Sequence, residues 1–505
     1  MNIRQKNWNI IVNNSFDVVI IGGGINGASV YRELSRQGYK VLLVEKGDFS
    51  CGTSQSSAMM IWGGLLYLKN LAFLSVYSLS NDRDKMINFF QDQITEKYFR
   101  YISNEKWGRN KYLAYFALQL YWMMSAFRRE RPKFEKKFEE LDFLNQQNSN
   151  ESILYQEGFL KESDCRLILD WIIENQTENC LAINYCSIQN ATYNNKDKFW
   201  SVDLKDHFLN NECKIKTKVI LNCAGVWTDA VNEQFGIYSP YKHVFSKGVF
   251  IGYKRPENHN VPLIFEMGEH GDTLTFIPWG PISLWGPTET KVNSIDEGFK
   301  IIPEDIEFLL KQASRNLKFS LAQSPIVSMR CGLRPLVVKK TFKFDCYPLS
   351  LSRKYKIVKD ENTPWISIYG GKISGCLSMA AKVEKEIRSK FFPNLHRVLN
   401  TKVKNAKNET VRTNFPGLID KVPSIEWCVK REFCCTLEDY LRRRTNISQW
   451  IAREGLGFQN ENLEFLENLA SYLPLRKQDH GDSPVIEYRR KVEEEFDNII
   501  KKINK

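Results

Sequence analysis

The stretch from Phe16 to Glu45 constrains the fold of this chain more than any other part of the sequence. It opens with residues 17–21, a short apolar and β-branched run that is typical of a strand buried on both faces of a parallel sheet. A turn of the pattern G-x-G-x-x-G follows at once, formed by Gly22, Gly24 and Gly27. In such a turn the glycines permit a tight reversal, close approach of a pyrophosphate, and packing of a helix on a strand.

A helix and a second strand complete the unit. The sequence predicts the helix over residues 28–37, ended by Gly38, and the strand over residues 41–44. The helix N-terminus would direct unpaired N–H groups at phosphates. Glu45 ends the second strand about 20 residues after the glycine turn, where a carboxylate binds ribose hydroxyls. The pattern therefore predicts a dinucleotide site, and the acid favours FAD or NAD over NADP.

Composition sets the outer limits. With 505 residues, of which 43% are hydrophobic and 26% charged, the chain is long enough for two or three folded domains. The net charge of +12 is spread among acidic residues, which favours an anionic membrane face over nucleic acid as a partner. The twelve cysteines form no CxxC pair and no Cys/His metal spacing, and residues 1–15 lack the apolar core of a secretory signal. Reduced thiols, a cytoplasmic location and no metal are therefore expected.

The segment after Glu45 is rich in small hydroxyl and glycine residues and would run in extended form along a flavin and its pyrophosphate. Together with the glycine turn it resembles the FAD-dependent, aerobic glycerol-3-phosphate dehydrogenases, which read roughly G-G-G-I-N-G and then T-S-S-x-S-S-K-L-I-H-G-G-L-R-Y-L. The matching residues after the glycine turn are Thr53, Ser54, Ser57, Ile61, Gly63, Gly64, Leu65, Tyr67 and Leu68. The resemblance implies FAD as the cofactor.

The resemblance continues along most of the chain. Matching segments are residues 164–167, 184–185, 221–227, 247–248, 277–279, 286–289, 332–336, 369–372 and 436–445. The implied fold is α/β, with a Rossmann-like FAD-binding domain, a mainly antiparallel β-sheet substrate domain and a C-terminal helical domain. We assign residues 1–80, 150–237 and 330–395 to the first, residues 81–149 and 238–329 to the second, and residues 396–505 to a linker and the third.

Two later turns are expected to reach the same flavin. Residues 219–221 and 365–368 read as apolar strands, and each ends in a turn of small residues where backbone can approach a ligand closely. The second turn precedes a helix whose N-terminus would face the pyrimidine edge of the flavin, and Lys372 would stabilise negative charge on the reduced ring. The predicted FAD-binding residues are Gly22, Gly24, Ile25, Asn26, Gly27, Glu45, Lys46, Thr53, Ser54, Ser57, Gly63, Gly64, Ala224, Gly225, Trp227, Gly371, Lys372 and Ile373.

The expected substrate pocket departs from the family pattern in one direction. Histidine and cationic positions of the family are occupied by sulfur, aromatic or aliphatic side chains, namely Met59, Trp62, Leu66 and Phe250. Arg334 and Lys372 remain. Because arginine and lysine supply the charge-assisted bonds that a phosphate dianion needs, we expect a small-molecule substrate that is larger or less anionic than glycerol 3-phosphate.

The resemblance implies an FAD-dependent dehydrogenase or oxidase, which takes hydride from a CH–OH or CH–NH centre to flavin N5 and passes electrons to quinone or oxygen. The residues expected to act on the substrate are Arg334, Lys372, Tyr67 and His270, with His243 and Glu289 as further candidates for the base. An amine substrate would need no dedicated base. Three alternatives stay open: glycerol-3-phosphate oxidation itself, a flavin-binding scaffold without turnover, and an NAD-dependent dehydrogenase.

Residues 112–127 are apolar almost all round and lead into a basic run over residues 128–137. The segment is shorter than the ~20 residues that span a bilayer. It is either a core helix with a charged exit, or an interfacial segment whose aromatics lie among lipid headgroups and whose arginines meet anionic phosphates. The residues alone slightly favour the core helix, whereas membrane association in the resembling family favours peripheral contact at the inner face of a membrane.

Overall fold

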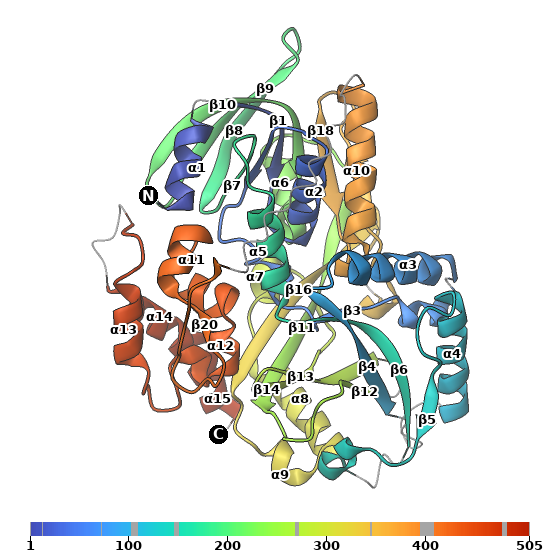
Figure 1. Cartoon of the computed structure of the whole chain (residues 1–505). Helices are drawn as coiled ribbons and strands as arrows, with labels where there is room; N and C mark the ends of the chain where they lie inside the picture. Colours follow the sequence, from blue (N-terminus) through green and yellow to red (C-terminus); the bar gives the residue numbers. More distant parts are fainter. Residues whose placement is uncertain are drawn as a thin grey trace.

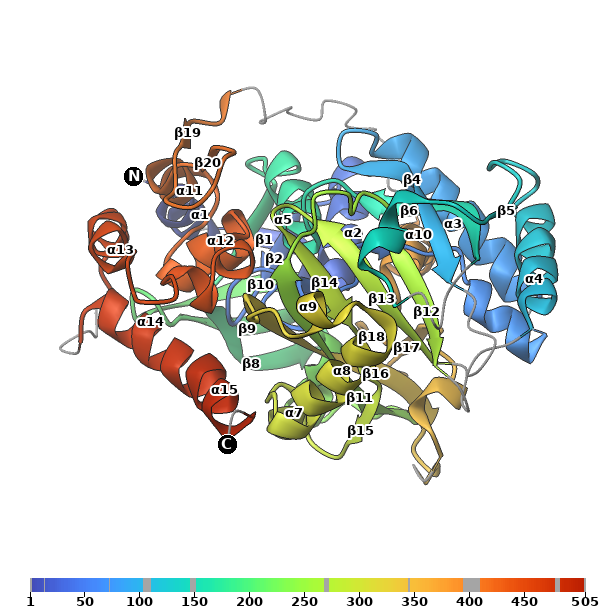
Figure 2. The same cartoon turned by 90° about the horizontal axis from the view of Figure 1, so that it is seen from below.

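The computed structural model describes residues 2–12, 14–71, 73–102, 110–145, 151–267, 272–343, 346–393, 409–476 and 482–503. Two large β-sheets form the body of the molecule, and helices of the C-terminal part pack beside them (Figure 1). The view turned by 90° again shows these helices, coloured orange to red, at one side of the sheets (Figure 2).

The first sheet contains the nucleotide-binding unit. Its strand order is β17-β18-β10-β1-β2-β7, and the five strands from β18 to β7 run parallel. They are β1 (Ser15–Ile21), β2 (Val41–Val44), β7 (Cys180–Ile183), β10 (Asn211–Asn222) and β18 (Trp365–Tyr369), flanked by antiparallel β8 (Cys186–Asn194), β9 (Phe199–Asp206) and β17 (Lys356–Lys359). The helices around it are α1 (Ile3–Ile11), α2 (Ile25–Arg36), α5 (Asp164–Glu174), α6 (Thr228–Gln234) and α10 (Cys376–Phe391).

Helix α2 begins three residues earlier than the sequence predicted. Gly24 has extended backbone angles and is the N-cap, so the helix starts at Ile25, inside the glycine motif. Gly27 then lies in the first helical turn, where a Cβ atom would stand 1.8 Å from the carbonyl oxygen of Gly22. Glycine at this position is therefore required for the helix to pack on the end of β1.

The second sheet is mainly antiparallel, with the order β15-β11-β14-β13-β12-β4-β6-β3, and β16 pairs with β11. Among its described strand pairs only β4 with β12 is parallel. The strands are β3 (Met60–Ile61), β4 (Ile94–Ile102), β5 (Lys133–Glu135), β6 (Ser152–Leu160), β11 (Tyr241–Lys254), β12 (Leu263–Met267), β13 (Asp272–Trp279), β14 (Ile282–Gly286), β15 (Thr290–Val292) and β16 (Ser328–Lys339).

Three strands of the second sheet fall inside ranges that the sequence analysis assigned to the first domain. Strand β3 lies within residues 1–80, β6 lies within residues 150–237, and most of β16 lies within residues 330–395. They pair with strands distant in the chain, and no local pattern in the sequence encodes such partners. Segments of the second sheet therefore alternate along the chain with segments of the first.

The C-terminal part is helical, as predicted. Its elements are α11 (Ile425–Arg431), the π-helical turn η9 (Asp439–Arg444), α12 (Ile447–Trp450), α13 (Leu463–Ala470), α14 (Pro484–Val492) and α15 (Asn498–Ile503), preceded by the hairpin β19 (Arg412–Thr413) and β20 (Val422–Pro423). It shares one hydrophobic core with the second sheet and with α8 (Pro303–Asn316), in which Tyr440 and Leu441 belong to the same cluster as Trp285 and Leu309.

Helix α4 (Lys111–Met124) corrects the core interpretation of residues 112–127. Only Ala114, Leu118 and Tyr121 of this helix are buried. Tyr112, Leu113, Phe116 and Met123 are exposed, and Figure 1 shows the helix at the outer edge of the molecule beside α3 (Phe73–Phe89). Because the segment is apolar on all faces, its hydrophobic pattern could not indicate which face would be buried. None of the helices in the described ranges has the length and apolar character that crossing a bilayer requires.

Candidate active site

One cavity of about 1450 Å³ lies between the two sheets. Its wall includes the carboxyl ends of four parallel strands, represented by Ile21, Val44, Cys223 and Gly370. Ligands of open α/β sheets bind at this edge. Residues of β11, β12, β13, β16 and α8 line another part of the wall, so the cavity spans the junction of the sheets.

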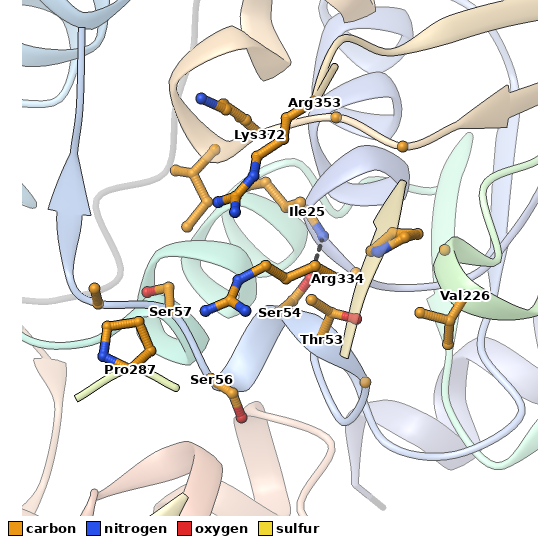
Figure 3. Close-up of a pocket in the computed structure, with 18 of the residues that line it drawn as sticks. Ile25, Thr53, Ser54, Ser56, Ser57, Val226, Pro287, Arg334, Arg353 and Lys372 are labelled. Carbon is orange, nitrogen blue, oxygen red and sulfur yellow. Dashed lines mark hydrogen bonds between the residues drawn. The ribbon is translucent and has the colours of Figure 1, made fainter. Parts of the chain in front are cut away.

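The glycine turn and the hydroxyl-rich loop form one end of the cavity. The N–H of Ile25, at the start of α2, donates to Ser54 Oγ at 3.0 Å, which is the dashed contact in Figure 3. Gly22 has a φ of +101° and Gly24 lies against Ser54, so neither position has room for an ordinary side chain. A helix start that directly follows Gly22, Gly23 and Gly24 suits the close approach of a pyrophosphate.

A buried carboxylate, Asp164, fixes the hydroxyl-rich loop that contains Thr53 and Ser57. Asp164 Oδ2 accepts the N–H of Ser57 at 2.8 Å and a guanidinium N–H of Arg330 at 3.0 Å. Thr53 Oγ1 donates to the carbonyl of Leu333 at 2.5 Å. The loop is therefore fixed between α2, α5 and β16 along the cavity wall.

Glu45 lines the cavity, but its carboxylate also accepts hydrogen bonds from backbone N–H groups. Oε2 accepts the N–H of Gly23 at 2.7 Å, and Oε1 accepts that of Gly47 at 2.8 Å. Burial raises the pKa of Glu45, although these two bonds oppose that effect. Each oxygen retains a lone pair, so binding of ribose hydroxyls stays a prediction.

The structure brings the two later turns to the glycine turn. Ala224, Gly225 and Trp227 follow β10, and Gly371, Lys372 and Ile373 follow β18; all of them line the cavity together with Gly22. Asn26 in α2 donates through Nδ2 to the carbonyl of Gly370 at 2.9 Å, which joins the second turn to the glycine motif. Of the other residues predicted to bind FAD, Gly27, Gly63 and Gly64 do not line the cavity. Gly27 packs closely against the backbone of Gly22, and Gly63 and Gly64 pack closely against side chains.

Arg334 faces the cavity beside a second arginine that the sequence analysis missed. Arg353, in the segment between β16 and β17, lies 2.9 Å from Glu289 Oε2, and Arg334 lies 3.1 Å from the same oxygen. Ser246 Oγ donates to Glu289 at 2.6 Å. Figure 3 shows both guanidinium groups pointing into the same part of the cavity. Burial would raise the pKa of Glu289, but the two arginines outweigh burial and hold that pKa below its usual value.

Lys372 is the third cationic side chain at this end of the cavity. Its Nζ lies 4.0 Å from the centre of the Tyr67 ring. Burial, followed by the charge of Arg353, holds the pKa of Lys372 well below its usual value. Burial also raises the pKa of Tyr67 to about 12, so its phenol is neutral near pH 7. The Lys372 amine and the neutral phenol ring of Tyr67 therefore lie in contact beside the arginine pair.

The residues that replace family histidines and cations divide into two groups. Trp62 and Phe250 line the cavity, whereas Met59 is fully buried behind it. The side chain of Leu66 lies outside the described part of the structure, as does the whole of His270. The apolar character expected of the pocket thus comes from two aromatic rings, together with Met60.

His243, a candidate base, does not line the cavity. Its Nε2 accepts the N–H of Gly370 at 3.1 Å, and its Nδ1 lies 3.2 Å from Asp229. Both ring nitrogens thus face protein groups, and Glu289 is likewise engaged by two arginines. Neither residue is placed to take a proton from a substrate.

Three observations indicate that the cavity can accommodate FAD. Its volume exceeds the ~300–1,000 Å³ of pockets that hold one drug-sized ligand, which leaves room for a dinucleotide and a substrate. The glycines directly before the helix start leave room for a pyrophosphate, and Lys372 with the Gly371 turn offers positive charge for a reduced ring. Gly22, Glu45, Ser54 and Gly371 would hold the cofactor.

Comparison with known proteins identifies the family. The sequence matches the family described as FAD dependent oxidoreductase over residues 17–351. Aerobic glycerol-3-phosphate dehydrogenase from Staphylococcus aureus is 26% identical over 386 residues, which cover 74% of this chain and 66% of the relative. The matched part therefore spans just under two thirds of that relative's length.

Solved structures share the fold. Glycerol-3-phosphate dehydrogenase from Bacillus halodurans, complexed with FAD, has a TM-score of 0.69 at 19% identity, covering 98% of this chain and 97% of that chain. L-α-Glycerophosphate oxidase from Mycoplasma pneumoniae with FAD bound has a TM-score of 0.57 at 16% identity, covering 74% and 94%. Glycine oxidase from Geobacillus kaustophilus has a TM-score of 0.54 at 16% identity, covering 75% and 96%.

These findings confirm the predicted α/β fold class and the predicted cofactor. A resemblance to glycerol-3-phosphate dehydrogenases, inferred from ordered short motifs, is confirmed as well. The chain belongs to the family of FAD-dependent oxidoreductases, and FAD is its cofactor.

Proposed function

We propose that this protein oxidises a CH–OH or CH–NH centre of an organic monoanion, with FAD as the hydride acceptor. The observation that carries the proposal is the arginine pair on Glu289, which faces the cavity next to Lys372. Two guanidinium groups against one carboxylate leave a net charge of +1. A single carboxylate neutralises this charge, whereas a phosphate dianion exceeds it.

The arginine pair and the aromatic wall would orient the substrate. Guanidinium groups bind carboxylates through paired charge-assisted hydrogen bonds, which fix both position and direction. Trp62 and Phe250 exclude water from the cavity next to this anchor. The substrate therefore combines one anionic group with an apolar or bulkier body, in agreement with the expectation of a substrate less anionic than glycerol 3-phosphate.

Lys372 is the proton acceptor in this proposal. When bound, FAD supplies a flavin N5 that accepts hydride. Oxidation of an alcohol also needs a base near neutral pKa, and burial beside Arg353 lowers the pKa of Lys372 toward that range. Proton uptake by Nζ restores a positive charge in the cavity. For a neutral amine, the nitrogen lone pair assists hydride departure, the product is an iminium ion, and the base is not needed.

Glycerol-3-phosphate oxidation is the second candidate, supported by the curated relatives and by the basic residues Arg334, Arg353 and Lys372 in the cavity wall. A panel assay separates the candidates. Anaerobic FAD-loaded protein is mixed with 2-hydroxy acids, amino acids, N-methyl amino acids and glycerol 3-phosphate, and loss of flavin absorbance is followed. We expect a carboxylate monoanion to bleach the flavin faster than glycerol 3-phosphate. Fastest bleaching by glycerol 3-phosphate would refute the monoanion, and no bleaching by any compound would support a non-catalytic flavin-binding scaffold.

We further propose that the protein delivers electrons to a membrane quinone, with oxygen as the alternative acceptor. Helices α3 and α4 lie side by side (Figure 1). These helices and the residues next to their ends expose a set of large apolar side chains, which we call the apolar face. Its members are Leu71, Phe73, Leu74, Tyr77, Phe89, Tyr112, Leu113, Phe116, Met123 and Phe127. The basic residues from Arg128 to Lys137 follow α4 in the sequence. Exposed apolar side chains followed by cations suit the interface of an anionic bilayer.

The double variant Leu74→Asp/Phe116→Asp tests membrane contact. Burying a leucine or phenylalanine side chain contributes about 1.5–3 kcal/mol, so losing both is expected to weaken vesicle binding by at least about tenfold. Sedimentation with phosphatidylglycerol vesicles measures the effect, and phosphatidylcholine vesicles report the electrostatic share. Tyr472→Asp, on the exposed surface of the C-terminal part, serves as the control. Equal binding by all three proteins would rule out the apolar face as the contact.

A further inference from the structure

A buried histidine and a glycine turn meet between the first and second sheets. His243 lies on β11, and its side chain is fully buried. Its Nε2 accepts the backbone N–H of Gly370 at 3.1 Å, although the two residues are 127 positions apart. The imidazole also packs against the ring of Tyr369, with centroids 4.9 Å apart. The histidine thus holds the last residues of β18 and the turn that follows them.

Asp229, in the first turn of α6, fixes the orientation of the imidazole. Its Oδ2 accepts the backbone N–H of His243 at 2.8 Å and lies 3.2 Å from Nδ1. The proton of the neutral ring is therefore assigned to Nδ1, which leaves the lone pair on Nε2 for Gly370. If the ring were protonated on both nitrogens, or if its single proton were on Nε2, Nε2 would have no lone pair for the Gly370 N–H.

The turn held in this way adopts a conformation that needs fixed partners. Gly370 and Gly371 have φ values of +62° and +117°. The carbonyl of Gly370 accepts Asn26 Nδ2 at 2.9 Å, so Asn26 holds one polar group of the residue and His243 holds the other. Gly371 and Lys372 follow directly and line the cavity. A change in the Gly370 peptide therefore moves both.

We propose that His243 is a positioning residue that, through neutral Nε2, sets the Gly370–Gly371 turn and Lys372 against the flavin ring. The inference rests on the proposed place of the ring beside Gly371. The backbone N–H groups of the turn and the ammonium form of Lys372 stabilise negative charge on the reduced cofactor. Loss of the Gly370 contact loosens the turn and weakens this stabilisation, which makes the reduced state less favourable.

Two variants of His243 test the proposal on FAD-loaded protein without any substrate. His243→Leu removes the acceptor, while His243→Gln offers an amide oxygen at a similar distance. We expect His243→Leu to lower the midpoint potential of the flavin and to alter its visible absorbance, and His243→Gln to recover most of both. Because the potential is measured by chemical reduction, its outcome is independent of whether the proposed substrate class is right.

His259→Leu is the matched control. His259 is also fully buried, pairs its Nδ1 with Ser283 Oγ at 2.7 Å, and stacks on Phe276, but it does not line the cavity. We expect this variant to lose thermal stability while the potential and spectrum stay unchanged. If His243→Leu does not retain FAD, Asp229→Asn is measured, and a smaller fall in potential is expected. Wild-type potential in the His243 or Asp229 variant, or an equal shift in the His259 control, would overturn the proposal.

Discussion

Replacing Asp48 with asparagine is expected to lower the free energy of unfolding by about 3–5 kcal/mol, because it breaks a buried ionic network. Asp48 is fully buried and lies 2.6 Å from Arg443 Nε and 2.5 Å from Arg444 Nη1. Arg443 has further acidic partners in Glu438 and Asp439, whereas Asp48 is the one carboxylate found on Arg444 in the described structure. The variant leaves a buried guanidinium group without a counter-charge. Urea denaturation measures the loss.

The exposed ion pair of Arg489 with Glu493 provides the comparison. Both side chains are nearly half exposed, so Arg489→Ala is expected to change stability by less than about 1 kcal/mol. A loss from Asp48→Asn no larger than the loss from Arg489→Ala would show that the buried network contributes little beyond a surface pair.

The contribution of Asp48 to the free energy of unfolding is also expected to depend on pH. Burial raises its pKa, but Arg444 and Arg443 outweigh burial and lower the pKa to about 2. Because the folded pKa lies below the unfolded value of about 3.9, the stabilisation is complete above pH ~4 and is lost as pH falls toward 2. The stability difference between wild type and Asp48→Asn should therefore shrink below pH 4. A difference that is constant from pH 7 to pH 3 would contradict this origin.

The same network connects the C-terminal helices to the cofactor site. Asp48 follows Glu45 and Gly47 in the loop after β2, and both of those residues line the cavity. The carbonyl of Gln55, in the hydroxyl-rich loop, accepts hydrogen bonds from Arg330 and Arg442. Two loops on the FAD cavity are thus fixed by arginines of η9. We infer that the C-terminal part stabilises the cofactor loops, and FAD retention should fall together with stability in Asp48→Asn.

The nucleotide unit could be predicted from the sequence because all its signals are local. The strand, the glycine turn, the helix and Glu45 lie within one stretch, so periodicity and glycine spacing agree with each other. The sequence analysis also found the motif 436–445. It did not show why the arginines of this motif are there, because their partner Asp48 is almost 400 positions away from Arg444. Local patterns identify the arginines and do not show their partner.

The cationic end of the cavity could not be predicted in the same way. Arg353 lies in a segment without a periodic pattern, and its partner Glu289 is 64 positions away. His243 was a candidate base because histidines are common proton acceptors. In the structure it is buried outside the cavity lining and accepts the N–H of Gly370. In each case the decisive contact joins distant strands or loops, which only the folded chain brings together.

Replacing Glu289 with glutamine is expected to change which anion the cavity prefers. The substitution removes the carboxylate that, within the described ranges, pairs with both arginines, so the net charge at Arg334 and Arg353 rises from +1 to +2. A phosphate dianion then becomes the better complement, because charge-assisted bonds to arginine no longer compete with an internal carboxylate. We expect the ratio of kcat/KM for glycerol 3-phosphate to that for a carboxylate monoanion to rise by at least about tenfold, equivalent to ~1.4 kcal/mol.

Arg334→Gln is the counterpart that should act in the opposite direction. It removes one cation from the same pair and leaves Arg353 neutralised by Glu289, so the anchor for any anion is lost. Truncating one partner of a buried charge pair costs about 2–5 kcal/mol, so kcat/KM for a monoanion should fall by roughly 30-fold or more. Stopped-flow bleaching with both anions measures both variants. If Glu289→Gln lowers both rates equally while Arg334→Gln leaves them unchanged, the arginine pair is structural and the anion is bound elsewhere in the cavity.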